Sequence, residues 1–137
     1  MNGMRIDGEC FCKDIAYEAE LVSAEISLCH CSDCQALSGS PYRATATARQ
    51  EDFRVTRGAP ACYVKTGSSG LKSAQYFCSA CGSNLYRIGE NDDKVGIRIG
   101  TIRQRHQLTP TDQSWLQSAL RWTEDLSGIP ERTGPGV

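Results

Sequence analysis

Short runs of alternating apolar and polar residues, separated by turn signals, dominate the chain. This alternation fits strands that are buried on one face only, because successive side chains of a strand point to opposite faces. It predicts strands over residues 13–21, 42–48, 53–55, 62–65, 73–77, 85–88 and 95–99. Turns rich in glycine, proline, serine or asparagine are expected at residues 57–60, 67–70 and 89–93. Many short strands at this spacing predict antiparallel sheets.

Helical patterns are scarce. Ser32 is a candidate N-cap for a short helix over residues 33–37, which the Ser38-Gly39 pair and Pro41 would end. The fold class predicted from these patterns is therefore mainly β, with little helix.

A second helical stretch is predicted over residues 115–120, with Ser114 as its cap. Helical spacing would place Trp115 and Trp122 on one face. We interpret Trp115, Leu116 and Trp122 as packing residues rather than as a box that binds substrate.

A chain of 137 residues fits one domain. A domain near this size buries roughly 68% of the surface that its unfolded chain exposes, so it can hold a core without covalent cross-links. With 39% hydrophobic and 23% charged residues, the composition is that of an ordinary globular protein. We predict a single domain over residues 1–127 and a loose tail over residues 128–137.

Charge and hydropathy argue against two classes of partner. The formal net charge is -1, without a basic stripe for nucleic acid or a polybasic patch for an anionic membrane. No segment approaches the roughly 18 apolar residues of a membrane span. Residues 1–8 lack the apolar segment of a secretory signal. We therefore predict a cytoplasmic protein, in which thiols stay reduced.

Eight cysteines in a reducing compartment point to metal ligands rather than disulfides. Three clusters hold most of them: Cys10 and Cys12; Cys29, Cys31 and Cys34; and Cys78 and Cys81. Two pairs of cysteines add up to a closed tetrahedral site, whereas the middle cluster is one sulfur short. Structural zinc sites are closed by four protein ligands, and catalytic ones keep a position open. Soft thiolates favour zinc, but the spacing leaves open which clusters share a metal.

The cysteines have three other interpretations. A disulfide framework is disfavoured because 8 cysteines in 137 residues fall below the density of such scaffolds. A thioredoxin-like redox pair needs a βαβ pattern, which is not visible. A module in which every metal site is closed and structural stays an alternative.

The remaining candidates are isolated residues. Cys62 lies alone in a predicted strand, and we expect a buried structural thiol rather than a ligand. His30 lies between two cysteines and should point away from their metal, in a structural or exposed role. His106 is expected to be a solvated loop residue. Tyr42 and Arg43 either line a pocket beside the middle cluster or are ordinary strand residues.

Three motifs together resemble those of the glutathione-dependent formaldehyde-activating enzyme family, whose relatives include centromere protein V. They are Gly8-Glu9-Cys10-Phe11-Cys12, then Cys29-His30-Cys31-Ser32-Asp33-Cys34 with Ser38-Gly39 soon after, and Phe77-Cys78-Ser79-Ala80-Cys81-Gly82-Ser83-Asn84-Leu85. The resemblance spans residues 3–126, and the ordered set is specific although each motif alone is weak.

The resemblance implies a β-tent of short antiparallel sheets clasped around two zinc ions. The structural zinc would be held by Cys10, Cys12, Cys78 and Cys81, and the catalytic zinc by Cys29, Cys31 and Cys34. The activity it implies is that of a carbon-sulfur lyase, which adds glutathione to formaldehyde to give S-(hydroxymethyl)glutathione. No motif in the chain identifies a glutathione site.

Two functions of different classes follow. The leading hypothesis is a zinc-dependent carbon-sulfur lyase that joins a small thiol, such as glutathione, to a small aldehyde. The rival is a non-catalytic, zinc-stabilised binding domain on the same fold. A zinc-ribbon nucleic-acid binder is disfavoured by the net charge of -1, and the oligomeric state is left open.

Overall fold

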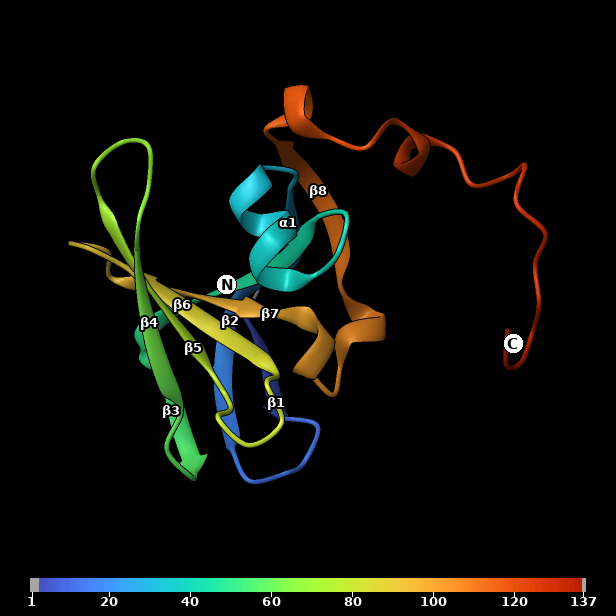
Figure 1. Ribbon diagram of the computed structural model, residues 1–137. Helices are drawn as coiled ribbons and strands as arrows, with labels where there is room; N and C mark the ends of the chain where they lie inside the picture. Colours follow the sequence, from blue (N-terminus) through green and yellow to red (C-terminus); the bar gives the residue numbers. More distant parts are fainter. Residues whose placement is uncertain (1–2, 137) are drawn as a thin grey trace.

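The computed structural model describes residues 3–136, and these form a mainly β fold (Figure 1). The strands are β1 (Met4–Glu9), β2 (Ala16–Cys29), β3 (Arg43–Arg57), β4 (Ala61–Thr66), β5 (Lys72–Phe77), β6 (Asn84–Gly89), β7 (Lys94–Arg98) and β8 (Thr109–Ser114). The helices are α1 (Ser32–Ser38) and the 3-10 turns η1 (Ile99–Thr101), η2 (Arg105–Gln107), η3 (Leu116–Ser118) and η4 (Arg121–Glu124). The prediction of a mainly antiparallel β protein with little helix is confirmed. The outer limits of the predicted domain and tail, residues 1–2 and 137, lie outside the described residues.

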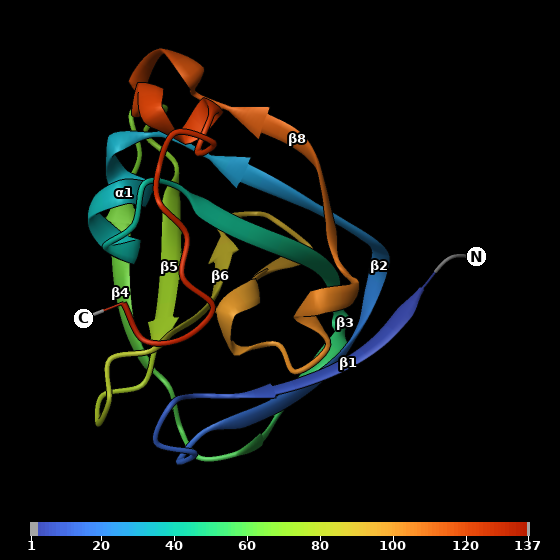
Figure 2. The same ribbon diagram turned by 90° about the vertical axis from the view of Figure 1, so that its right-hand side faces the viewer.

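All eight strands join one hydrogen-bonded sheet, in which seven follow the order β1-β2-β3-β7-β6-β5-β4. Neighbours in this order run antiparallel. β8 pairs in parallel with residues 25–29 of β2, beyond the stretch of β2 that pairs with β1 (Figure 2). Within residues 3–136, none of the helices combines the length and the hydropathy that a membrane span requires.

Several strand predictions differ from the structure in their limits. β2 begins three residues later than predicted, because Lys13 has a φ of 70° in the turn before it, and it continues to Cys29. β1 and β8 were not predicted. The β8 sequence, Thr-Pro-Thr-Asp-Gln-Ser, has no apolar alternation because all six residues are exposed. Main-chain pairing with β2 makes it a strand, and a hydrophobic pattern cannot reveal such pairing.

The predicted first helix is present, with a different cap. Cys31 rather than Ser32 is the N-cap residue, and its sulfur accepts a hydrogen bond from the N–H of Cys34. Gly39 ends the helix with a left-handed φ of 63°, a conformation that glycine adopts without steric cost. Cys31, which the sequence predicts to be a metal ligand, is therefore also the N-cap of α1.

The prediction of a helix over residues 115–120 is wrong. Trp115 has a left-handed φ of 60°, and η3 and η4 follow it in place of an α-helix. Trp115, Leu116 and Trp122 are 49%, 58% and 53% exposed, so their interpretation as packing residues is also wrong within this chain. The segment after β8 runs away from the sheet (Figure 1), which leaves these side chains without a core to enter.

The middle of the sheet has an apolar face and a polar face. The apolar face meets the core through Ile26, Ala46, Ala48, Val95 and Ile97, beside Ile6, Tyr17, Leu21, Leu85 and Ile102. The opposite face, here called the polar face, carries Cys29, Arg43, Thr45, Gln75, Arg87, Gly96 and Arg98. Strand alternation creates both faces. The sequence Arg-Ala-Thr-Ala-Thr-Ala at the start of β3 shows it most clearly.

Replacement of Ile97 tests whether the apolar face supplies the stability of the fold. Ile97 is fully buried at the centre of the sheet, so Ile97→Ala should lower the free energy of unfolding by about 2–5 kcal/mol. Val64 on β4 is 51% exposed, and Val64→Ala should change it by less than about 1 kcal/mol. Urea unfolding of the metal-loaded proteins measures both. Equal losses in the two variants would contradict this assignment of the core.

Candidate metal centres

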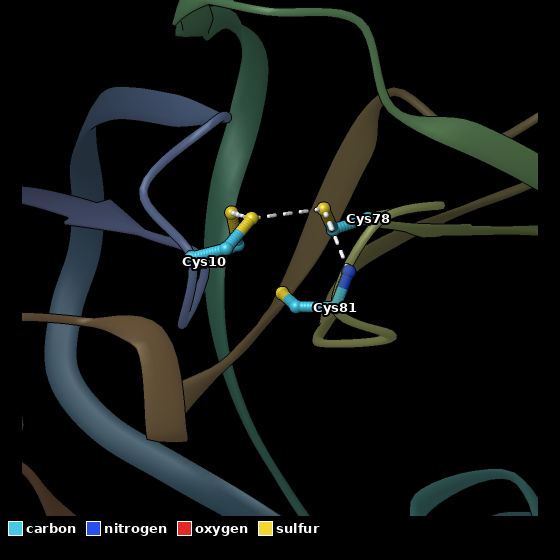
Figure 3. A group of neighbouring side chains, drawn as sticks. Cys10, Cys78 and Cys81 are labelled. Atoms are coloured by element: carbon cyan, nitrogen blue, oxygen red, sulfur yellow. Dashed lines mark hydrogen bonds between the residues drawn. The ribbon is translucent and has the colours of Figure 1, made fainter.

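Four cysteines from two distant turns form the first candidate centre. Cys10 and Cys12 lie in the β1–β2 turn, and Cys78 and Cys81 lie in the β5–β6 turn. The four sulfurs all lie within 4.8 Å of one another. Figure 3 shows the sulfurs of Cys10, Cys78 and Cys81 directed into the space between the two turns. The Sγ–Sγ distances are 3.6 Å from Cys10 to Cys12 and 3.7 Å from Cys12 to Cys78. Tetrahedral zinc with bonds of about 2.3 Å spaces its sulfur ligands by about 3.8 Å, so the group fits such an ion.

Backbone hydrogen bonds fix the two turns around these sulfurs. The N–H of Ile15 donates to Cys10 Sγ at 3.3 Å, and the N–H of Cys81 donates to Cys78 Sγ at 3.5 Å. Gly82 has a φ of 80°, and its N–H donates to the carbonyl of Cys78 at 2.8 Å. Cys10 and Cys78 are 1% and 2% exposed within the hydrophobic core. Loss of this centre would therefore disturb the core as well as the turns.

Ser83 prepares one of the four thiols for metal binding. Its hydroxyl lies 3.2 Å from Cys81 Sγ, and hydrogen bonds from this hydroxyl and from the Ser83 N–H lower the pKa of Cys81 to about 6. The thiolate, rather than the thiol, is the metal ligand. Ser83 therefore favours the ionised, metal-binding form of Cys81.

The second candidate centre lies where β2 leads into α1. Cys29 ends β2, Cys31 caps α1, and Cys34 lies in the first turn of the helix. Their three sulfurs lie within 4.8 Å of one another. Within residues 3–136, no other cysteine, histidine, aspartate or glutamate contributes a ligand atom to this group. The group can hold a metal with three thiolates, and their chemistry is consistent with zinc.

Neither Cys62 nor His106 belongs to either group of sulfurs. Cys62 is exposed, so the prediction of a buried thiol is wrong. It lies on β4, which is the edge strand of the sheet, and the described residues place no further strand beyond it. His106 is exposed in η2, as predicted.

The thiols of the second group differ in their ease of ionisation. Burial opposes ionisation of Cys29, but hydrogen bonds from the Cys31 backbone and the Ser114 hydroxyl lower its pKa. Burial raises the pKa of Cys34 to about 12, and the neighbouring Cys29 and Cys31 add to this effect. A coordinated metal deprotonates a thiol outright. Metal binding here therefore releases protons and weakens as the pH falls.

His30 points away from the sulfurs on either side of it, as predicted. It is buried, with Nε2 2.8 Å from Gln113 Oε1 on β8. Its ring packs edge-on against Tyr42, with 5.2 Å between the ring centroids. The structure thus gives Tyr42 a packing partner, and His30 ties the end of β2 to β8.

A buried polar network adjoins the second group. Gln75 Oε1 accepts hydrogen bonds from Arg43 Nη1 and from Arg98 Nη2, both at 3.1 Å, and Arg98 Nη1 donates to Thr45 Oγ1 at 2.7 Å. Arg43 was one candidate beside the middle cluster, whereas Arg98 and Gln75 were not predicted. The available signal was the strand parity of Arg98, which is opposite to that of Val95 and Ile97.

Comparison with known proteins identifies relatives of this fold. The family model described as glutathione-dependent formaldehyde-activating enzyme matches residues 5–118. The match confirms the resemblance seen in the three cysteine motifs. The solved structure of a Rhodobacter sphaeroides protein is 25% identical in sequence and superimposes with a TM-score of 0.63, covering 79% of this chain and 99% of that one. No curated protein matches the chain.

Removal of one sulfur from the first group tests its structural role. A thiolate zinc site contributes on the order of 10–16 kcal/mol of apparent binding free energy, which is comparable to the whole stability of a domain. Cys78→Ser should therefore lose one metal equivalent and unfold or aggregate. Cys62→Ser, which changes an exposed cysteine outside both groups, is the matched control. Metal content by mass spectrometry and thermal unfolding measure the effect, and a Cys78→Ser protein that matches the control in both would contradict the structural role.

Proposed function

The chain belongs to the glutathione-dependent formaldehyde-activating enzyme family, and we propose that it is a zinc-dependent carbon-sulfur lyase that joins a small thiol to a small aldehyde. One observation carries the proposal. The second group offers three sulfurs, Cys29, Cys31 and Cys34, and no fourth protein ligand within residues 3–136. Three protein ligands and a free position are the mark of a catalytic zinc site.

The two groups would then have different roles. Cys10, Cys12, Cys78 and Cys81 would hold a structural zinc, since four sulfurs leave no position for a substrate. Cys29, Cys31 and Cys34 would hold the second zinc of the chain. When bound there, zinc supplies two kinds of chemistry: it lowers the pKa of a coordinating thiol, and it polarises a carbonyl.

The protein's own contribution is to hold the three sulfurs in place before substrate arrives. The Cys34 N–H donates to Cys31 Sγ at 3.3 Å, which fixes the first turn of α1. The amide of Gln35 donates to the carbonyls of His30 and Ser118, at 2.8 and 3.0 Å. These bonds tie α1 to the end of β2 and to the segment after β8. A fixed set of ligands spares the site reorganisation during the reaction.

The proposed reaction is an addition that balances without a further reactant. The sulfur of the substrate thiol forms a bond to the carbonyl carbon of the aldehyde. The π electron pair of the carbonyl moves to its oxygen, and that oxygen takes up the proton that the thiol releases. With glutathione and formaldehyde the product is S-(hydroxymethyl)glutathione. We expect this chemistry in the cytoplasm, where thiols stay reduced.

A non-catalytic binding domain is the second candidate. The exposed apolar side chains after β8 favour it: Trp115, Leu116, Leu120, Trp122, Leu126 and Ile129 are all at least 38% exposed. Several large apolar side chains exposed in one segment are typical of a protein-contact surface. Binding would not need an open metal position, so the catalytic assay separates the two candidates.

Exchange spectroscopy tests the lyase proposal. The zinc-loaded protein should increase the NMR exchange rate between formaldehyde and glutathione above the spontaneous rate. Cys31→Ser should abolish this increase and lose one zinc equivalent while the sheet stays folded, because the first group keeps its four sulfurs. Cys62→Ser should retain the full effect. If a panel of small thiols shows no acceleration with both zinc ions bound, the lyase proposal fails and the binding domain is favoured.

A further inference from the structure

Two buried arginines share the polar face with the second cysteine group. In the pairing of β2 with β3, Cys29 lies opposite Arg43, and in the pairing of β3 with β7, Thr45 lies opposite Arg98. Residues opposite each other in an antiparallel pair project from the same face. Arg43 and Arg98 are 5% and 7% exposed. Such burial is rare for arginine and costly unless an opposite charge compensates it.

The hydrogen bonds of the two arginines involve neutral partners. Both guanidinium groups donate to the same oxygen, Gln75 Oε1, at 3.1 Å, which brings two positive charges close together. Three of their nitrogens, Arg43 Nε, Arg43 Nη2 and Arg98 Nε, are buried without a hydrogen-bond partner. Within residues 3–136, neither arginine forms a salt bridge with a carboxylate. The amide therefore positions the charges but does not neutralise them.

The neighbouring charged side chains are already paired. Arg87 on β6 lies 3.9 Å from Asp92, and Lys65 on β4 lies 2.8 Å from Asp33 of α1. Burial lowers the pKa of Arg43, and the cysteines of the second group oppose this once they are thiolates, as a bound metal makes them. Burial and the neighbouring Arg43 lower the pKa of Arg98, and Cys34 and Cys29 oppose this in the same way. Because Cys29 lies directly opposite Arg43 on the polar face, the arginine pair adjoins the second cysteine group.

A count of formal charges gives the pair a role. Zinc with three thiolates carries one net negative charge, and the two arginines carry two positive charges. The set keeps one uncompensated positive charge, which a fourth ligand with a single negative charge would neutralise. We propose that Arg43 and Arg98, positioned by Gln75, make the open position of the Cys29–Cys31–Cys34 zinc selective for anionic ligands, such as a thiolate, over neutral ones. This inference rests on the proposed function and specifies its substrate class.

Arg43 and Arg98 would act through the field at the metal rather than by touching the ligand, because their free donors are buried. They are thus positioning residues in this proposal. A purely structural role predicts a different result. Loss of either arginine would then loosen β5 through Gln75, and the binding of every ligand would weaken by the same factor. The two roles differ in how the affinity depends on ligand charge.

Azide and imidazole separate these roles, because both bind metals through nitrogen and only azide is charged. Binding is followed by the visible spectrum of the protein loaded with cobalt(II), in which the closed first site gives a constant background. The ratio of azide affinity to imidazole affinity should be higher for the wild-type protein than for a free cobalt(II) complex. Arg98→Gln should weaken azide binding by about tenfold and leave imidazole binding within about twofold. Arg98→Lys should restore most of the azide affinity.

Arg54→Gln is the matched control, because Arg54 is an exposed arginine that pairs with Glu18 toward the other end of β3 from Arg43. If Arg98→Gln does not fold, azide and imidazole binding can be compared in Arg43→Gln instead. The wild-type preference for azide also tests the proposal without any variant. Equal losses for azide and imidazole, or no wild-type preference for azide, would overturn the inference while leaving the open zinc site intact. A wild-type spectrum that neither ligand changes would instead contradict the open site itself.

Discussion

Mutual repulsion among closely spaced thiolates is the constraint on which the structure depends. The chain gathers seven sulfurs into two groups, each within 4.8 Å, and thiolates at such distances repel one another unless a cation lies among them. Where four sulfurs converge from two turns, Cys10 and Cys78 also enter the hydrophobic core. Metal binding and core formation are therefore coupled at that end of the sheet. Without metal, the folded core would enclose two ionisable thiols, those of Cys10 and Cys78.

The same repulsion explains the polar face. Around the second group the chain places cations rather than further ligands, and Arg43, Arg98 and Gln75 connect the start of β3 to β5 and β7. Antiparallel register makes this possible because it carries one face from β2 across to β5. The apolar face of the same strands supplies the stability. One set of strands thus supports a core and a charged site with alternate residues.

Sequence patterns predict the parts of this structure that depend on local spacing. Cysteine spacing identifies the seven sulfurs, and alternation identifies most strands and the mainly β class. The exposed strand β8 escapes prediction because it is held by main-chain bonds to β2. The pattern does not predict the exposure of Cys62 and Trp115 either, because it shows which side chains share a face and not whether another element covers that face. The hydrogen bond from Arg98 to Gln75 joins β7 to β5, two strands that are not neighbours in the sheet. Local sequence periodicity cannot predict such a tertiary contact.

X-ray absorption at the zinc edge tests most directly whether the chain holds one closed and one open thiolate centre. Seven cysteine sulfurs shared by two zinc ions average 3.5 sulfurs per ion. The two-centre arrangement predicts this average, with an oxygen or nitrogen atom as the fourth ligand of the open centre. It also predicts that the average rises to about 4 sulfurs when glutathione is added. Four sulfurs per zinc before any thiol is added, or an average that glutathione does not change, would contradict it.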